Sequence, residues 1–257
     1  MEFQPRHVGS VEAALEGLAA DGLAVIDRVF DAGQVERLKG LLDAEIERDR
    51  EAGILFHDGA DCNERLLDIT ARHAEFRALV EHPLVAAIAA NWLKPDFRLS
   101  SFGANVTTPG ACSRFVHSDQ CYVPSPWPDY PLTLNLMWVL DDFTPERGAT
   151  HVMPGSHRAT RGPWLDEPCE GTVPLLCEAG SVIAMDGRVW HHTGANTTKD
   201  QRRAVLLMYL VNWFILPQSD WPTLFPPDWR DDLSPRMREL LGFGEKASMR
   251  LEQFAGA

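Results

Sequence analysis

Two short segments of the 257-residue chain carry side chains that suit a metal ion. The first contains His117 and Asp119, which are two positions apart and would point to the same face at the end of a strand. The second contains His191 and His192, beginning 74 residues after His117. A distal histidine from another strand would complete a set of two imidazoles and one carboxylate, which binds Fe(II) and leaves adjacent positions open for oxygen chemistry. Alone, the His-x-Asp spacing is a weak signal, because a simple His–Asp hydrogen bond gives the same pattern.

A loop of polar residues follows the two histidines and leads to a pair of arginines, Arg202 and Arg203, at the start of an apolar run. An arginine entering a strand at this point can bind a carboxylate through two parallel hydrogen bonds. The adjacent histidines of a strand point to opposite faces, so only one of His191 and His192 can be the metal ligand.

Two further segments between the candidate ligands have a characteristic sequence. Met153–Arg158 contains Pro-Gly-Ser-His, and Asp141–Thr150 is an acidic segment that leads into it. With the histidine, aspartate and arginine positions, these segments make the chain similar to the phytanoyl-CoA dioxygenase-like branch of the Fe(II)/2-oxoglutarate-dependent oxygenases. The resemblance covers most of the chain. It implies a mainly β fold with flanking helices around a double-stranded β-helix, the jelly-roll or cupin-like core of that superfamily.

The family pattern also selects one histidine of the adjacent pair and one arginine of the adjacent pair. Its members place an asparagine five residues after the distal histidine and the 2-oxoglutarate-binding arginine eleven residues after it. Asn196 and Arg202 stand at these distances from His191. His192 and Arg203 are also eleven apart, but no asparagine lies five residues after His192. The resemblance therefore favours His191 and Arg202.

The resemblance implies a role for each of these residues. His117, Asp119 and His191 would hold Fe(II), while 2-oxoglutarate and O₂ would take the open positions. Arg202 would bind the far carboxylate of 2-oxoglutarate, and Thr193, on the same face as His191, would lie near it. Halogenases of the superfamily have Gly or Ala in place of the carboxylate ligand. The presence of Asp119 therefore favours hydroxylation, or a related oxidation such as desaturation, ring closure or epoxidation.

Three other polar residues are weaker candidates for co-substrate contacts. Asn105 and Asn135 fall in expected strands that would line the cavity, where each could bond a 2-oxoglutarate carboxylate. Arg114 stands where family members often have glutamine, so it would add a cation to the pocket. Ordinary turn asparagines and a surface arginine explain these three residues equally well.

The expected activity is oxidation of an unactivated C–H of a small metabolite or natural-product intermediate, most simply hydroxylation, with release of succinate and CO₂. The aromatic and proline-rich segment Gln120–Tyr130 would form a wall for an apolar substrate. Two alternatives stay open. One is an acyl-CoA hydroxylase of the same family, and the other is a jelly-roll protein that binds without catalysis or uses another metal.

Composition indicates which classes of partner are disfavoured and which cellular compartment is expected. The net charge of −13 disfavours binding to nucleic acid or to anionic membranes. The five cysteines are odd in number and include no Cys-x-x-Cys pair, which fits a reducing compartment. The N-terminal residues do not resemble a signal peptide, and the longest apolar run is too short to span a bilayer. We therefore expect a cytoplasmic protein, with its oligomeric state left open.

Hydrophobic periodicity predicts the elements that would position these residues. The chain is expected to be one domain, with a mostly helical part at 1–95, a jelly-roll core at 96–216 and a helical tail at 217–257. A strand at Leu23–Ile26 interrupts the first helices, and Asp31 is expected to cap the second. Pro83 would break the third helix, His73–Asn91, and short strands follow Pro95.

Overall fold

The computed structural model describes residues 3–58, 63–111 and 115–243, so the candidate Arg114 lies outside the described residues. The helices in this part of the chain are α1 (Val11–Asp21), α2 (Ala32–Glu51), α3 (Ile69–Arg72), α4 (Ala74–Val80), α5 (Pro83–Trp92), α6 (Trp221–Leu224), α7 (Pro227–Arg230) and α8 (Pro235–Leu240). The strands are β1 (His7–Val8), β2 (Leu23–Ile26), β3 (Phe56–Asp58), β4 (Asn63–Leu66), β5 (Arg98–Thr107), β6 (Thr133–Val139), β7 (Thr150–Val152), β8 (Val173–Pro174), β9 (Val182–Asp186), β10 (His191–Thr193) and β11 (Arg203–Val211).

The expected helix ends are confirmed. The side chain of Asp31 accepts a hydrogen bond from the backbone N–H of Gln34, whose side chain in turn accepts one from the Asp31 N–H. This reciprocal pair satisfies two donors that would otherwise lack partners at the start of α2. Pro83 stands in the first turn of α5, where its missing N–H costs nothing, and it separates α5 from α4.

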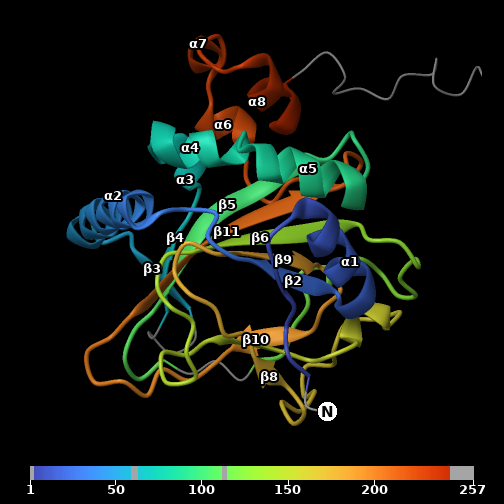
Figure 1. Cartoon of the computed structure of the whole chain (residues 1–257). Coiled ribbons are helices and arrows are strands. Elements are labelled where there is room, and N and C mark those ends of the chain that lie inside the picture. Colours follow the sequence, from blue (N-terminus) through green and yellow to red (C-terminus); the bar gives the residue numbers. More distant parts are fainter. Residues whose placement is uncertain (1–2, 59–62, 112–114, 244–257) are drawn as a thin grey trace, which may run out of the picture.

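The strands form two sheets that face each other. The larger sheet has the order β1-β2-β9-β6-β11-β5-β4-β3, and the smaller has the order β10-β7-β8. Figure 1 shows α4, α5 and α6 above the larger sheet and the strands β8 and β10 below it. We call the side of the larger sheet that faces β10, β7 and β8 the inner face.

Side chains alternate along the central strands and give the two faces different characters. On β6, Leu134, Leu136 and Trp138 belong to the main hydrophobic core, which includes residues of the helices. Met137 and Val139 belong to a smaller cluster on the inner face. Since both faces of β6 are covered, all of its residues are buried.

A close contact joins the end of α1 to the Pro-Gly-Ser-His segment. Gly22 ends α1 with a φ of 81°, and a Cβ atom placed there would lie 2.7 Å from the ring of His157. Only glycine combines this backbone conformation with such a close approach. The Pro-Gly-Ser-His segment therefore packs its histidine against the end of α1, and His157 serves packing here.

The fold class predicted from the resemblance is confirmed: the protein has a large sheet with flanking helices and a second, smaller sheet. The sequence did not predict strands β3 and β4, because residues 50–65 have a loop-like composition. These strands extend the larger sheet beyond β5 and add Asn63 and Arg65 opposite Thr107 and Asn105. No helix in the described ranges has the length and apolar character needed to cross a membrane.

Candidate metal and co-substrate site

The first two candidate ligands are joined through their backbones. The N–H of His117 donates to the carbonyl of His191 over 3.0 Å, and the N–H of His191 donates to the carbonyl of His117 over 2.8 Å. This is the hydrogen-bonded pair of an antiparallel bridge, and it places the two imidazole rings with centroids 4.2 Å apart. Residues 74 positions apart in the sequence thereby share one site.

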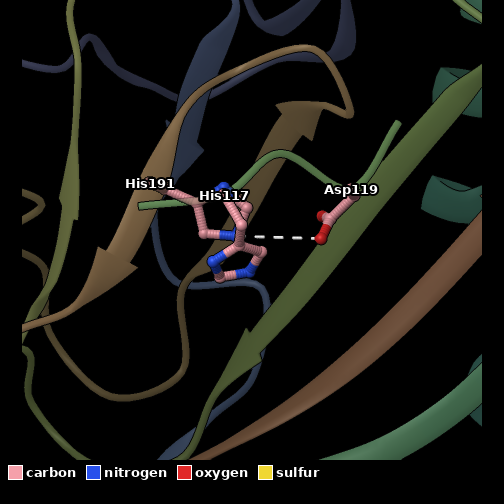
Figure 2. Close-up of side chains that lie close together, drawn as sticks. All are labelled: His117, Asp119 and His191. Carbon is pink, nitrogen blue, oxygen red and sulfur yellow. Dashed lines mark ion pairs between the residues drawn. The ribbon is translucent and has the colours of Figure 1, made fainter. Parts of the chain in front are cut away.

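Asp119 completes a cluster with these histidines. One potential ligand atom from each of His117, Asp119 and His191 lies within 4.8 Å of the others, so the three residues can hold a metal ion. Nε2 of His191 lies 3.8 Å from Oδ1 of Asp119, the contact that is drawn as a dashed line in Figure 2.

The two imidazoles are arranged as metal ligands require. Nδ1 of His117 lies 3.2 Å from the carbonyl oxygen of Phe115, and Nδ1 of His191 lies 3.0 Å from that of Val189. A proton on each Nδ1 satisfies these carbonyls and leaves the Nε2 lone pair for a metal. Burial, together with the neighbouring His191, lowers the pKa of His117 to about 4. The neutral form, which is the ligating form, therefore prevails at neutral pH.

His192 lies on the other face of β10. Its Nε2 is 3.2 Å from the hydroxyl of Thr172, and its ring centroid is 5.0 Å from that of His151. Among the described residues, the cluster of potential ligands therefore contains His191 and excludes His192.

A cavity of about 530 Å³ opens beside the cluster. His117, Asp119 and His191 line it, and so do Thr193 and two of the weaker candidates, Asn105 and Asn135. Its walls also include apolar side chains from the inner face and from the loops above it, namely Leu67, Tyr122, Met137, Met185, Val205, Leu207 and Tyr209.

Arg202, the arginine predicted to bind 2-oxoglutarate, is not among the residues that line the cavity. It precedes β11, is one-third exposed, and forms an ion pair with Asp43 of α2, with Nη2 to Oδ1 at 2.5 Å. The inner face of β11 begins one residue later, with Arg203, Val205 and Leu207 on the same side as one another. The spacing of eleven residues from His191 thus ends on the outward-facing neighbour of the inward-facing arginine.

Arg203 is fully buried. Its Nη2 donates to the hydroxyl of Thr107 over 2.5 Å, and its guanidinium lies 4.4 Å from the centroid of the Phe143 ring. Nε and Nη1 have no hydrogen-bond partner, and no carboxylate of the described residues forms an ion pair with it. Burial lowers the pKa of this guanidinium to about 9. A buried cation without a counter-ion is costly, so this position suits an anionic ligand.

Residues that the sequence did not single out also line the cavity. Arg65 stands opposite Asn105 across β4 and β5, so it brings a second guanidinium to the inner face. The phenol of Tyr209 donates to the backbone carbonyl of Asp119 over 2.5 Å. The period-two alternation from Arg203 through Val205 and Leu207 would have placed Tyr209 on the inner face, had the register of β11 been known.

Comparison of the chain with known proteins establishes its family. Residues 18–204 match the model of the phytanoyl-CoA dioxygenase (PhyH) family. The chain belongs to that family. Dioxygenase af480 of Aspergillus fumigatus is 32% identical to it over 240 residues, which are 90% of this chain and 77% of af480.

Solved structures share the fold of this PhyH-family protein. The carbocyclase SnoK from nogalamycin biosynthesis is 24% identical with a TM-score of 0.68, and the match covers 87% of this chain and 91% of SnoK. HygX from Streptomyces hygroscopicus, solved with nickel and 2-oxoglutarate, is 18% identical with a TM-score of 0.68, covering 80% of this chain and 88% of HygX. These structural similarities confirm the jelly-roll fold predicted from the sequence.

Proposed function

We propose that this PhyH-family protein is an Fe(II)- and 2-oxoglutarate-dependent oxygenase that oxidises a C–H bond of a small molecule. The observation that carries the proposal is the combination of two features between the two sheets. Two imidazoles and one carboxylate converge at a cavity, and a buried arginine without a carboxylate partner lies beyond its lining. This combination suits one ligand that chelates a metal at one end and is anionic at the other.

The donor set fits Fe(II). His117, Asp119 and His191 are nitrogen and oxygen donors of the type that holds non-haem Fe(II) and leaves positions open. When bound, Fe(II) with 2-oxoglutarate and O₂ supplies the oxidising power for C–H chemistry, with succinate and CO₂ as by-products. The part of the chain is to hold the metal, to orient the co-substrate and to exclude water.

We assign the far carboxylate of 2-oxoglutarate to Arg203 in place of Arg202. Arg203 pairs with Thr107 across β11 and β5, and the next inner-face pair, Val205 and Asn105, lines the cavity. A carboxylate here would give the unpartnered Nε and Nη1 an acceptor and would compensate the buried charge. Thr193 on β10 and Asn105 on β5 remain candidates for further hydrogen bonds to the co-substrate.

The cavity favours a substrate with an apolar body. Tyr122, from the aromatic segment 120–130, lines the cavity with Leu67, whereas Trp127 of the same segment is buried and Tyr130 lies outside the lining. Asp68 and Asp220 also line the cavity, and carboxylates there would repel the phosphates of coenzyme A. We therefore favour a small metabolite over an acyl-CoA, and a cytoplasmic location stays a prediction from the sequence.

Hydroxylation is the simplest outcome, and ring closure is the second candidate. The retained Asp119 occupies the ligand position that a halide would need, so halogenation is disfavoured. The fold-level similarity to the carbocyclase SnoK keeps cyclisation open. The two reactions differ in whether an oxygen atom from O₂ enters the product.

The test is anaerobic titration of 2-oxoglutarate into the Fe(II)-loaded protein, followed through the visible metal-to-ligand charge-transfer band. Wild type should develop the band, while His117→Ala and Asp119→Ala, each lacking one ligand, should not. When O₂ is then admitted, wild type should convert 2-oxoglutarate to succinate, slowly even when no substrate is present. A wild-type protein that develops no band would overturn the proposed function.

A further inference from the structure

Two residues that face each other on the inner face, Asn135 and Tyr209, both donate hydrogen bonds to the candidate ligand Asp119. Asn135 on β6 and Tyr209 on β11 stand directly opposite each other in the antiparallel register. Nδ2 of Asn135 donates to Oδ2 of Asp119 over 3.1 Å, and the phenol of Tyr209 donates to the Asp119 backbone carbonyl over 2.5 Å. One cross-strand pair thus holds both the side chain and the main chain of Asp119.

The two oxygens of the Asp119 carboxylate have different surroundings. Oδ1 is the oxygen that faces the metal cluster, 3.8 Å from Nε2 of His191, while Oδ2 is occupied by the amide of Asn135. An oxygen that already accepts a hydrogen bond from a fixed, buried amide is a poorer second ligand than a free one.

We propose that Asn135 and Tyr209 are positioning residues that hold Asp119 as a one-oxygen metal ligand. This inference rests on the proposed function of the site. A carboxylate that bound through both oxygens would take a fourth position on a six-coordinate ion. With three protein ligand atoms, three positions stay open, which is the number that a chelating co-substrate and one further molecule require.

The orientation of the Asn135 amide follows from the same contacts. Asn135 is 93% buried, and its Oδ1 has no hydrogen-bond partner in the described structure. Turning the amide over would place that oxygen against the Asp119 carboxylate, where two acceptors repel each other. One N–H of Nδ2 is therefore committed to Asp119. The second N–H of the same nitrogen stays available, so the contact with a 2-oxoglutarate carboxylate expected from the sequence stays a prediction.

Tyr209 is itself supported. Its hydroxyl lies 3.1 Å from the hydroxyl of Tyr122, which lines the cavity. Because Tyr209 gives its proton to the Asp119 carbonyl, Tyr122 is the donor in the second bond. This chain of hydrogen bonds connects a wall of the substrate cavity to the backbone of a candidate metal ligand.

The first experiment measures the affinity of the metal-free protein for Co(II), without 2-oxoglutarate, in Asn135→Ala and Asn135→Leu. Loss of such a supporting hydrogen bond typically weakens metal binding by about 10–100-fold, and we expect that range for both variants. The matched control is Asn63→Ala. Asn63 is also a buried inner-face asparagine with an unpartnered Oδ1, but it lies opposite Thr107 and has no contact with Asp119. Its affinity for Co(II) should equal that of wild type.

The second experiment reads the number of open positions through the 2-oxoglutarate charge-transfer band at saturating Fe(II). In both Asn135 variants the freed Oδ2 competes for a position, so the band should shift or weaken even when the metal site is full. Tyr209→Phe keeps the aromatic ring and removes only the hydroxyl, and it should weaken Co(II) binding at least threefold. If thermal unfolding shows that neither Asn135 variant folds, the Co(II) affinity of Tyr209→Phe tests the inference, and a wild-type value would overturn it.

Wild-type affinity for Co(II) and an unchanged band in the Asn135 variants would overturn the inference. So would a loss in Asn63→Ala as large as that in Asn135→Ala, because the effect would then come from any buried asparagine. A wild-type protein that gives no band at all is a different result, which would instead refute the proposed function.

Discussion

His117 and His191 are held together by two reciprocal backbone hydrogen bonds, of 3.0 and 2.8 Å, so the ring positions of the two candidate ligands depend on one antiparallel bridge. Backbone pairing of this kind forms with the sheet and does not require the metal. The positions of the two rings therefore follow from the strand pairing, and His191 differs from the adjacent His192 in the face of β10 on which it lies.

The adjacent histidines of β10 provide a direct test of that arrangement. His191→Ala removes a ligand and should reduce the affinity for Co(II) by more than about 100-fold, a larger loss than that of a supporting residue. His192→Ala removes a ring that packs against His151 and should leave that affinity within about threefold, the range expected away from the ligands. Calorimetric titration of both variants checks this, and the reverse order of losses would place the ligand at His192.

The neighbouring arginines form a second matched pair. Arg203→Met should raise the dissociation constant for 2-oxoglutarate by about 10–100-fold, since charge-assisted hydrogen bonds contribute roughly 1.5–3 kcal/mol. Arg202→Met breaks the ion pair with Asp43, which is partly exposed, and should change that constant less than about threefold. The charge-transfer titration measures both. A large loss in Arg202→Met alone would restore the assignment predicted from the spacing.

Arg203→Met should also separate stability from binding. In the absence of ligand, the substitution removes a buried cation that has no carboxylate partner, so the free energy of unfolding should stay equal or rise by about 1 kcal/mol. Addition of metal and 2-oxoglutarate should stabilise wild type more than the variant. Urea unfolding with and without ligands checks both parts. A large loss of stability in the ligand-free variant would show that the contacts with Thr107 and Phe143 outweigh the buried charge.

Asn196 fixes the loop that leads into β11. Its Nδ2 donates to the backbone carbonyls of Thr107 and Gln201, and its Oδ1 accepts from the N–H and hydroxyl of Thr198. Asn196→Ala removes all four of these hydrogen bonds, including the buried one to the Thr107 carbonyl, and should lower the free energy of unfolding by about 2–3 kcal/mol.

The control for this loop is Thr197→Ala at the adjacent, exposed position, which should change the free energy of unfolding by less than about 0.5 kcal/mol. Urea unfolding of both variants measures the difference. Equal stabilities of Asn196→Ala and wild type would show that water replaces these hydrogen bonds and that the loop does not need its asparagine.

Helix starts, most strands and the residues of the metal cluster could be predicted from the sequence, because they follow local rules. Asp31 and Pro83 begin helices through their own chemistry, and short apolar or alternating runs predicted most strands of the jelly roll. The His-x-Asp segment and the distal histidine pair identified the residues of the cluster. The family resemblance then supplied the topology, which periodicity alone does not contain.

The choice between Arg202 and Arg203 depended on tertiary structure. Adjacent residues of a strand point to opposite faces, so a difference of one residue in where β11 begins exchanges the buried arginine with the exposed one. The spacing of eleven residues gives only the number of positions between the histidine and the arginine. The path of the loop between them depends on the hydrogen bonds of Asn196. In the same way, only the pairing of β6 with β11 places Asn135 opposite Tyr209 and both against Asp119. The sequence by itself determined which residue types are available for the chemistry, and the register between distant strands decided which of them meet, because that register is a property of the assembled sheets.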